Sequence, residues 1–315
     1  MQSNGVISWP CWNAGCVTSP ALLTRGFSDI KLRYPAGYGC FSLELYEQES
    51  SMSSINSSKD ALTGPSAGNH FVQVYQDVDT LAGSVCHFIS DQLKPSEAAI
   101  IVATSANEKA IKRELIALGV DLQDAIDRGQ YRFFDAEALL SSVLVDGMPD
   151  IDKCDTSMKQ ILAEVCQEYE SVRVYGEAVN ILWQRNEKKA AMILENYWNG
   201  LFKEYAFSMM CAYYMDNLDP AAYHGDIECL CSSHTHFLPS QDFQLLDEAL
   251  QDASEDVMGV SLKGMMNSIA KFSHPTTIMP ASQASLLYIS KTMPMTTEFI
   301  LNRIRQKLVK PETAA

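Results

Sequence analysis

The stretch Ala98–Leu115 reads AAIIVATSANEKAIKREL and predicts a buried strand, a short polar turn and an amphipathic helix. The β-branched run at 100–102 is typical of a strand that is covered on both faces. In the helix, Ala110, Ile111 and Leu115 share one face, and charged residues occupy the other. In an α/β nucleotide-binding domain, a strand, turn and helix of this kind hold the phosphate loop.

The turn at 104–107, Thr-Ser-Ala-Asn, lacks the residues that a phosphate loop needs. It has no glycine for close backbone approach and no Gly-Lys-Ser/Thr, and Lys109 lies about one turn into the helix. The sequence therefore disfavours classical ATP hydrolysis and predicts an ordinary turn whose helix is capped by Ser105 or Asn107. The free N–H groups at this helix N-terminus can still hold an anionic ligand.

The same alternation of strands and helices continues on both sides of this stretch. Strands are expected within 70–76, 98–104, 130–137, 171–176 and 206–215, and helices within 77–93, 107–119, 136–147, 177–182 and 188–205. Strands that alternate with helices predict right-handed βαβ units. The expected fold is a three-layer α/β domain with a mostly parallel sheet and helices on both faces.

Three regions are expected along the chain. Residues 1–66, with the serine-rich run SSMSSINSSKD, predict a disordered or loosely ordered leader and linker. Met52 is an alternative start, which leaves open whether 1–51 belongs to the protein. Residues 67–239 form the α/β domain, and 240–315 form an α-helical C-terminal extension with apolar stripes and a basic last turn.

Composition narrows the class of partner. Hydrophobic residues make up 47% of the 315 residues, which is enough for a sizeable core, and the net charge is −15. Such an acidic chain is repelled by phosphate backbones, so direct nucleic-acid binding is not expected.

No apolar run is long enough for a membrane helix. Nine scattered cysteines, several inside apolar runs, suit reduced thiols and a cytoplasmic location.

Two groups of polar and aromatic residues are candidates for a ligand site. Arg173 and Glu177 flank a strand-to-helix switch, where α/β sheets bind ligands. Glu177 can act as a base or anchor there, or it can pair with Arg173 or cap the helix. Trp183 and Trp198 can be ligand platforms, but their helical spacing also fits core positions.

The segment CLCSSHTHFLP is the candidate metal site. Cys229, Cys231, His234 and His236 offer four ligands of the kind that zinc accepts. Their spacing matches no standard zinc finger, and so tight a loop rarely lets four ligands converge. A polar His234 facing a pocket, or a plain loop-to-strand segment, is the alternative. No metal and no cofactor is expected, and no Gly-x-Ser-x-Gly elbow names a covalent catalyst.

Five motifs together resemble the MEDS domain, the sensory domain of methanogens and methylotrophs seen in DcmR-type regulators. In chain order they read HFVQVYQDVDTL, YRFFDAEALLSSVLVDGMPD, RVYGEAVNILWQRNEKKAAMILENYWN, FSMMCAYYMD and CSSHTHFLP. The resemblance covers 69–239. One departure lies after Trp183, where Arg185-Asn186 stands in place of an expected glycine; asparagine tolerates the left-handed turn.

The resemblance implies a RecA/KaiC-like fold with a degenerate phosphate loop and a role as a ligand-sensing module in signalling proteins. It suggests small, hydrocarbon-like or one-carbon-related ligands. The motif positions that carry over are His70, Tyr75, Asp146, Gly147, Pro149, Arg173, Gly176, Glu177, Trp183, Glu195, Trp198, Asn199, Cys211, Tyr213 and His234. The expected ligand-binding residues among them are His70, Tyr75, Arg173, Glu177, Trp183, Glu195, Trp198, Tyr213 and His234. The chain shows no recognisable output domain.

Two functions follow from these observations. The first is a cytosolic regulatory protein that binds an unknown small molecule at the carboxyl ends of the strands. Its helical tail would relay the change, without catalysis, to a signalling partner or a second copy. The alternative is a nucleotide-binding or hydrolytic enzyme of RecA-like fold that uses Glu177. A structural zinc module at 229–236 is a third possibility.

Overall fold

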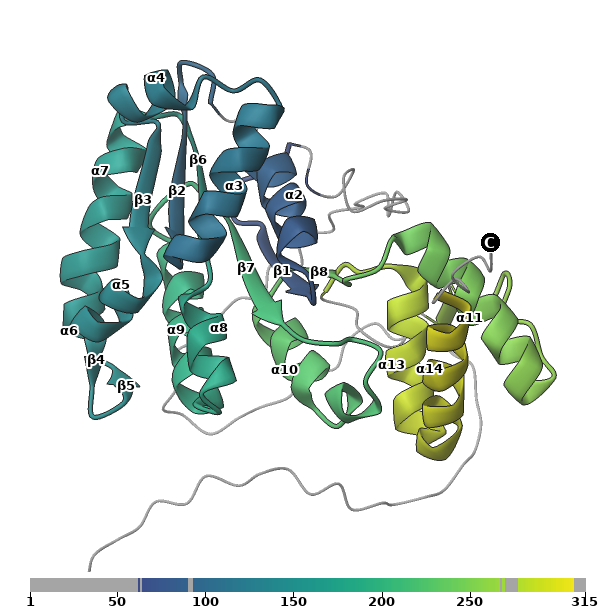
Figure 1. Cartoon of the computed structure of the whole chain (residues 1–315). Helices are drawn as coiled ribbons and strands as arrows, with labels where there is room; N and C mark the ends of the chain where they lie inside the picture. The colour runs from purple at the N-terminus through teal and green to yellow at the C-terminus, as the bar shows by residue number, and fades with distance from the viewer. Residues whose placement is uncertain (1–61, 63, 90–92, 267, 270–276, 309–315) are drawn as a thin grey trace, which may run out of the picture. The chain divides into compact units, whose positions relative to one another are not determined.

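Six parallel strands form the central sheet of the protein (Figure 1). The computed structural model describes residues 62, 64–89, 93–266, 268–269 and 277–308, so nearly all of the leader expected at 1–66 lies outside the described residues. The sheet order is β3-β2-β6-β7-β1-β8. Its strands are β1 (His70–Tyr75), β2 (Glu97–Ala103), β3 (Tyr131–Asp135), β6 (Ser171–Gly176), β7 (Ser208–Tyr214) and β8 (His236–Leu238).

Helices cover both faces of this sheet, which confirms the three-layer α/β fold. One face carries α2 (Val78–Ile89), α3 (Ser105–Ala117) and α4 (Leu122–Asp127). The other carries α5 (Ala136–Val143), α6 (Ile151–Cys154), the π-helical turn η2 (Asp155–Lys159), α7 (Gln160–Glu168), α8 (Ala178–Gln184), α9 (Lys188–Leu201) and α10 (Asp226–Ser233). The RecA/KaiC-like part of the expectation stays a prediction.

Strand β1 lies between β7 and β8 and fixes the position of the later site. His70 is its first residue and pairs in register with Met209, while Val72 pairs with Cys211. Side chains alternate along the strand. Val72 and Val74 therefore belong to the core under α9, and Phe71 and Tyr75 belong to the core under α2.

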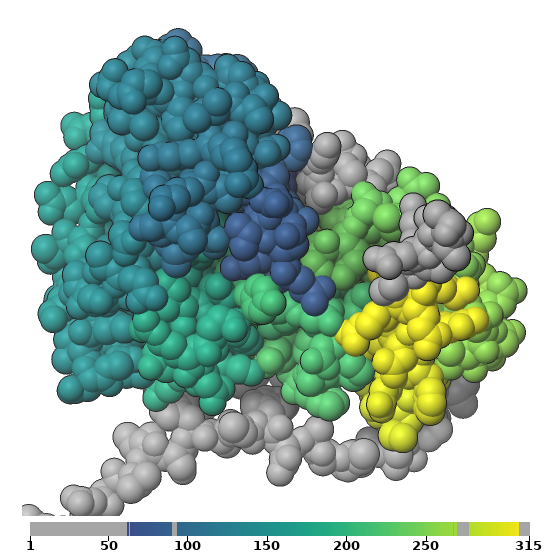
Figure 2. Space-filling model, viewed as in Figure 1, coloured from purple at the N-terminus to yellow at the C-terminus, as the bar shows by residue number. Residues whose placement is uncertain are grey.

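The C-terminal region is helical, as the sequence predicts. It contains α11 (Phe243–Met258), α13 (Ala281–Thr292) and α14 (Pro294–Leu308), which pack around their own apolar core. Their inward residues include Leu250, Ile289 and Ile304. Figure 2 shows that α14, in yellow, lies at the surface on the face in view. None of the helices in the described residues combines the length and apolar character needed to cross a membrane.

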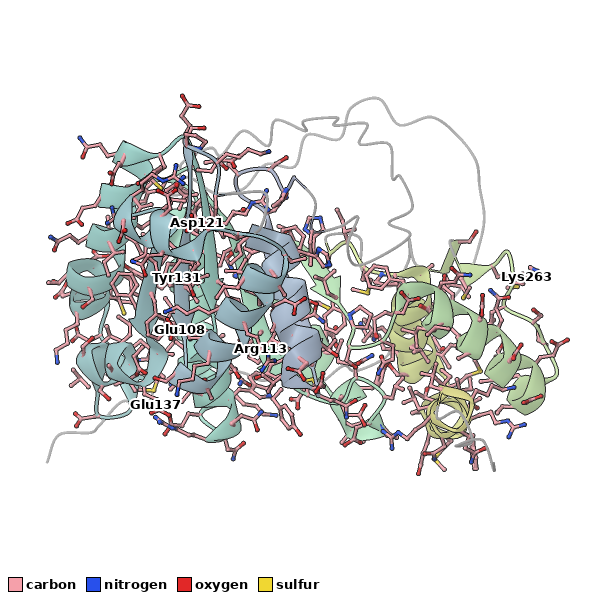
Figure 3. The ribbon with its side chains drawn as sticks, turned by 45° about the horizontal axis from the view of Figure 1, so that its top comes forward. Glu108, Arg113, Asp121, Tyr131, Glu137 and Lys263 are labelled. Atoms are coloured by element: carbon pink, nitrogen blue, oxygen red, sulfur yellow. The ribbon has the colours of Figure 1, made fainter. Side chains whose placement is uncertain are left out.

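The turn after β2 is an ordinary capped helix start, but its cap differs from the two predicted residues. Thr104 is the N-cap of α3, and its hydroxyl accepts a hydrogen bond from the Asn107 amide at 3.4 Å. The Ser105 hydroxyl instead donates to Asp135 at 3.2 Å. Arg113 of α3, labelled in Figure 3, pairs with Asp79 of α2. This exposed pair is worth little stability.

Short local signals account for the largest differences from the predicted elements. The helix expected at 136–147 ends at Val143 and is followed by a hairpin of β4 (Leu144–Val145) and β5 (Met148–Pro149). Its turn, Asp146-Gly147, has φ of 50° and 76°, a conformation that Asp-Gly favours. Helices α4, α6, α7 and α10 and the 3₁₀ turn η3 (Pro220–Tyr223) were not predicted.

One turn prediction is confirmed by the backbone. Asn186, where the family resemblance leads one to expect glycine, adopts a left-handed φ of 61°. The C-cap of α3 is Leu118, and Gly119 follows it with a left-handed φ of 84°. The six cysteines of the described part of the chain are free thiols, as the sequence predicts.

Candidate functional site

Four elements that are distant in sequence bring His70, Glu195, Cys211 and His234 together beneath α9. His70 opens β1, Cys211 lies in β7, Glu195 lies on the buried face of α9, and His234 follows the last turn of α10. We call these four residues the buried cluster. Each is at most 5% exposed. One ligand atom from each, a ring nitrogen, a carboxylate oxygen or the thiol sulfur, lies within 4.8 Å of the other three.

The Glu195 carboxylate is the centre of the buried cluster. Its Oε2 lies 3.4 Å from His70 Nε2 and 3.5 Å from Cys211 Sγ. Its Oε1 lies 3.4 Å from His234 Nε2. His70 Nε2 is also 3.3 Å from Cys211 Sγ. The two imidazole rings stand against each other with centroids 4.1 Å apart.

The outward nitrogens of both histidines are held by carbonyl oxygens. His70 Nδ1 lies 3.1 Å from the Ser233 carbonyl oxygen and 3.0 Å from Asn199 Oδ1. His234 Nδ1 lies 2.7 Å from the Leu230 carbonyl oxygen. Because a carbonyl oxygen can only accept, both Nδ1 atoms carry a proton. A ring that is protonated on Nδ1 alone carries its lone pair on Nε2, and in both histidines Nε2 points into the buried cluster.

Burial and neighbouring charges set the ionisation of the cluster. Burial lowers the pKa of His70 to about 3, with His234 adding to the effect, so His70 is neutral at pH 7. Burial alone would raise the pKa of Glu195, but His234, His70 and the Tyr213 hydrogen bond outweigh it and lower the pKa to about 2. Burial and the Glu195 charge raise the pKa of the Cys211 thiol well above its usual value.

Tyr213 and Trp183 form the wall of the cluster toward α8. The Tyr213 hydroxyl donates to Glu195 Oε1 at 2.5 Å, a short bond of the kind made to a charged acceptor. The Trp183 ring meets the Tyr213 ring edge-on at 5.3 Å. Lys188 Nζ lies over the Trp183 ring, 4.8 Å from its centre. The Tyr213 hydrogen bond fixes the orientation of the Glu195 carboxylate, and the Trp183 ring holds the Tyr213 ring in place.

A second polar group lies at the carboxyl end of the sheet and centres on Glu177. Its carboxylate accepts hydrogen bonds from the Thr104 backbone N–H and from the Asn107 side chain, both at the N-terminus of α3. Burial raises the pKa of Glu177. The Glu177 carboxylate therefore occupies the place at the N-terminus of α3 where an anionic ligand would otherwise bind. Tyr75, whose hydroxyl lies 3.3 Å from the Asn180 amide nitrogen, is beside it.

Arg173 belongs to neither group. Its side chain is 2% exposed, donates to the Phe88 carbonyl oxygen and lies 5.5 Å from the centre of the Phe88 ring. Phe88 is part of α2, on the face of the sheet opposite the buried cluster. The structure therefore does not bring Arg173 together with Tyr213 and His234, contrary to the single pocket that the sequence suggests.

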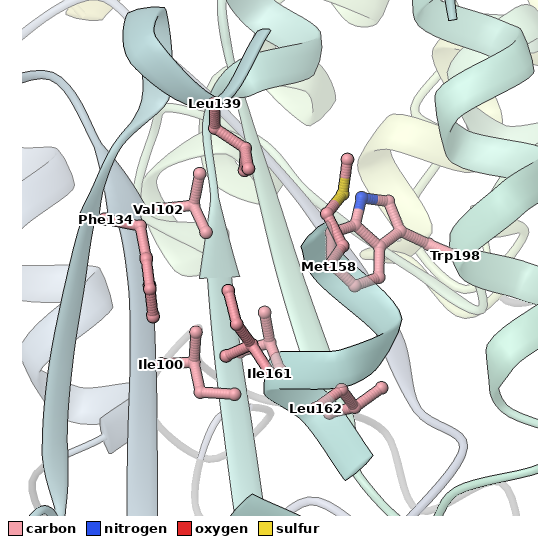
Figure 4. A pocket seen from close by; sticks show the side chains of 9 residues that line it. Ile100, Val102, Phe134, Leu139, Met158, Ile161, Leu162 and Trp198 are labelled. Carbon is pink, nitrogen blue, oxygen red and sulfur yellow. The ribbon is translucent and has the colours of Figure 1, made fainter. Parts of the chain in front are cut away.

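Trp198 is a core residue that also lines a small apolar cavity. It packs edge-on against Phe207 and Tyr197. Figure 4 shows the cavity between the sheet and the helices, with Trp198 and Met158 on one side. The space inside is about 10 Å³, room for one water-sized molecule. Its lining is Ile100, Val102, Phe134, Leu139, Met158, Ile161, Leu162, Val174 and Trp198.

The four ligands of the Cys-x-Cys-x-x-His-x-His segment are not gathered at one point. In the part of the chain that the structure describes, the group with metal-ligand geometry contains His234 but not Cys229, Cys231 or His236. His236 stacks on Phe71 at 4.4 Å, on the α2 side of the sheet. One residue of the buried cluster, Cys211, was absent from the expected binding residues, although it stands in a family motif.

The comparison with protein families agrees with the motifs seen in the sequence. The model of the MEDS family, described as the methanogen/methylotroph, DcmR sensory domain, matches residues 69–235. This range is more than half of the chain and contains the whole buried cluster. No curated protein matches the chain.

Proposed function

The chain belongs to the MEDS family of sensory domains, and from this premise we propose that it is a non-catalytic sensory protein. In this proposal a small ligand binds at the buried cluster of His70, Glu195, Cys211 and His234. The C-terminal helices pass the change on to a signalling partner or to a second copy of the chain. The family supports the sensing and regulatory role; ligand binding, relay and the absence of catalysis are our proposal.

The observation that carries the proposal is a direct hydrogen-bonded link from the cluster to α13. The Thr277 hydroxyl lies 3.2 Å from the carbonyl oxygen of His234 and 2.9 Å from that of Cys231. Next to it, the backbone of Ile278 bonds to Thr235 and Phe237, both at 2.8 Å. Residues 277–280 lead into α13, so a shift of His234 would act on the start of that helix.

In this proposal the partner binds the exposed face of α14. Met295 is 73% exposed and Phe299 is 63% exposed on α14. Large apolar side chains at such exposure are common on interaction surfaces. A ligand can change the populations of two arrangements of α13 and α14 only to the extent that it binds one arrangement more tightly than the other. The geometry of Glu177, whose carboxylate already engages the N-terminus of α3, gives no support to a bound nucleotide phosphate there.

Native mass spectrometry followed by hydrogen exchange tests this proposal. The full chain is purified gently and weighed under native conditions to detect a co-purifying molecule. Amide exchange of 277–308 is then compared between the chain as isolated and the chain unfolded, dialysed and refolded. We expect slower exchange in α13 and α14 of the chain that retains its ligand. Identical exchange in two forms that differ in ligand content would overturn the relay.

A further inference from the structure

We propose that the ligand of the buried cluster is a divalent transition-metal ion of the zinc class, held by His70 Nε2, His234 Nε2, Glu195 and Cys211 Sγ. The inference deepens the proposed function by naming the ligand of the same site. Metal binding itself rests on the geometry alone and can hold even if the relay to α13 fails.

Several separations between the cluster atoms are those of a tetrahedral site. Zinc bonds of about 2.0–2.3 Å at tetrahedral angles place neighbouring ligand atoms about 3.3–3.7 Å apart. His70 Nε2, Cys211 Sγ and Glu195 Oε2 form a triangle with sides of 3.3, 3.4 and 3.5 Å. His234 Nε2 lies 3.4 Å from the other carboxylate oxygen, Glu195 Oε1, and one ligand atom from each of the four residues lies within 4.8 Å of the other three. A metal bound to all four would draw His234 closer to this triangle.

The hydrogen-bonding pattern leaves the centre rich in lone pairs. Both Nε2 atoms and both Glu195 oxygens face inward as acceptors, whereas the inward donors are the Cys211 thiol and the Tyr213 hydroxyl. His234 Nε2 has no hydrogen-bond partner among the described residues, although it lies 3.4 Å from Glu195 Oε1. A buried polar atom of this kind costs free energy unless it is satisfied. A cation satisfies all these lone pairs at once.

The residues around the ligands have the arrangement of an outer metal shell. Histidines that bind a metal almost always donate their other ring N–H to a carbonyl or carboxylate, which fixes the tautomer. His70 does so to Ser233 and Asn199, and His234 does so to Leu230. Tyr213 orients the carboxylate in the same way.

The charges also balance. Within the described part of the chain, the basic side chains within 4.0 Å of the Glu195 carboxylate are those of the two histidines, and neither a lysine nor an arginine is among them. When the metal binds, the Cys211 thiol releases its proton to solvent, so a thiolate and a carboxylate neutralise a 2+ ion. Four protein ligands, all buried, make a closed site, which is the form that structural or tightly held metals take. Because the cluster is fully enclosed, we expect the metal to be acquired as the chain folds.

X-ray absorption and metal analysis of the full chain test the site. The chain is refolded with Zn²⁺, freed of excess metal, and analysed for bound zinc. We expect about one equivalent per chain, with a first shell of nitrogen and oxygen and one sulfur at about 2.3 Å. The wild-type measurement does not depend on whether a variant folds. No stoichiometric zinc, or a shell with two sulfurs from Cys229 and Cys231, would overturn the proposal.

Matched variants then assign the ligands. Cys211→Ser and His234→Gln should lose the bound zinc, while the controls Cys231→Ser and His236→Gln, neighbours outside the cluster, should keep it. With Co²⁺ in place of Zn²⁺, Cys211→Ser should also lose the thiolate-to-metal charge-transfer absorption. Removing an outer-shell partner, as in Asn199→Ala, should weaken zinc affinity by about 10–100-fold. Zinc that stays bound in both ligand variants and is lost in the controls contradicts the assignment.

Discussion

Replacing Thr277 with valine tests the link between the buried cluster and α13. Thr277 is 4% exposed, and its hydroxyl bonds the carbonyl oxygens of Cys231 and His234 at 2.9 and 3.2 Å. Valine has nearly the same size, so the substitution leaves no cavity and removes only the donor. Two buried carbonyls then lose a partner, which costs about 1–3 kcal/mol. We expect the free energy of unfolding to fall by that amount.

Urea unfolding and hydrogen exchange measure the effect of Thr277→Val. If the loss is local, amides at the start of α13 should exchange about 5–30-fold faster, the factor that 1–2 kcal/mol corresponds to. Thr297→Val is the matched control, because Thr297 is also buried but its hydroxyl makes a local bond, to the carbonyl oxygen of Met293 four residues before it. A change in unfolding free energy below about 0.5 kcal/mol, the usual range for a neutral surface change, would refute the reasoning.

Three further substitutions test separate parts of the account. Tyr213→Phe removes the donor to Glu195 and should lower the free energy of unfolding by about 1.5–3 kcal/mol in urea titrations; an unchanged midpoint would show that the bond contributes nothing. Burial raises the pKa of Glu177 above 4.5, so the folded wild type binds that proton more tightly than the unfolded chain, and its stability falls as pH rises from about 4.5 through the folded pKa. Glu177→Gln should make this pH dependence of unfolding shallower, and a steeper one would contradict the sign. Asn186→Ala places a residue with no αL preference at a φ of 61° and should cost about 1 kcal/mol in thermal unfolding, whereas a gain in stability would argue against the turn.

The sheet and its flanking helices were predictable because their signals are local. Runs of buried apolar residues, such as Ile100–Val102 in β2, and the stripes of α3 and α9 repeat at strand and helix spacing. The order of the strands carries no such signal, since β1 pairs with β7 and β8 across more than a hundred residues. Short elements such as α10 were missed because eight residues with few apolar positions give no clear period.

The candidate site was predictable in its members but not in its grouping. The motif positions include His70, Glu195, Tyr213 and His234, which meet in the structure. The sequence placed Arg173 with them because it cannot say which face of a strand points toward α2 and which toward α9. It also proposed metal ligands by closeness in the chain, at 229–236, whereas the geometry that suits a metal joins residues from four elements.

The most direct test of the central claim is hydrogen exchange of the full chain refolded with and without one equivalent of Zn²⁺. The account predicts that zinc slows exchange around His234 and, through Thr277, at the start of α13. Zinc should slow the exchange equally in the His236→Gln control and should not slow it in His234→Gln. If zinc binds with the expected shell but the exchange of α13 does not change, the metal site is supported and the proposed relay to α13 is refuted. No protection anywhere in the buried cluster would contradict the metal site itself.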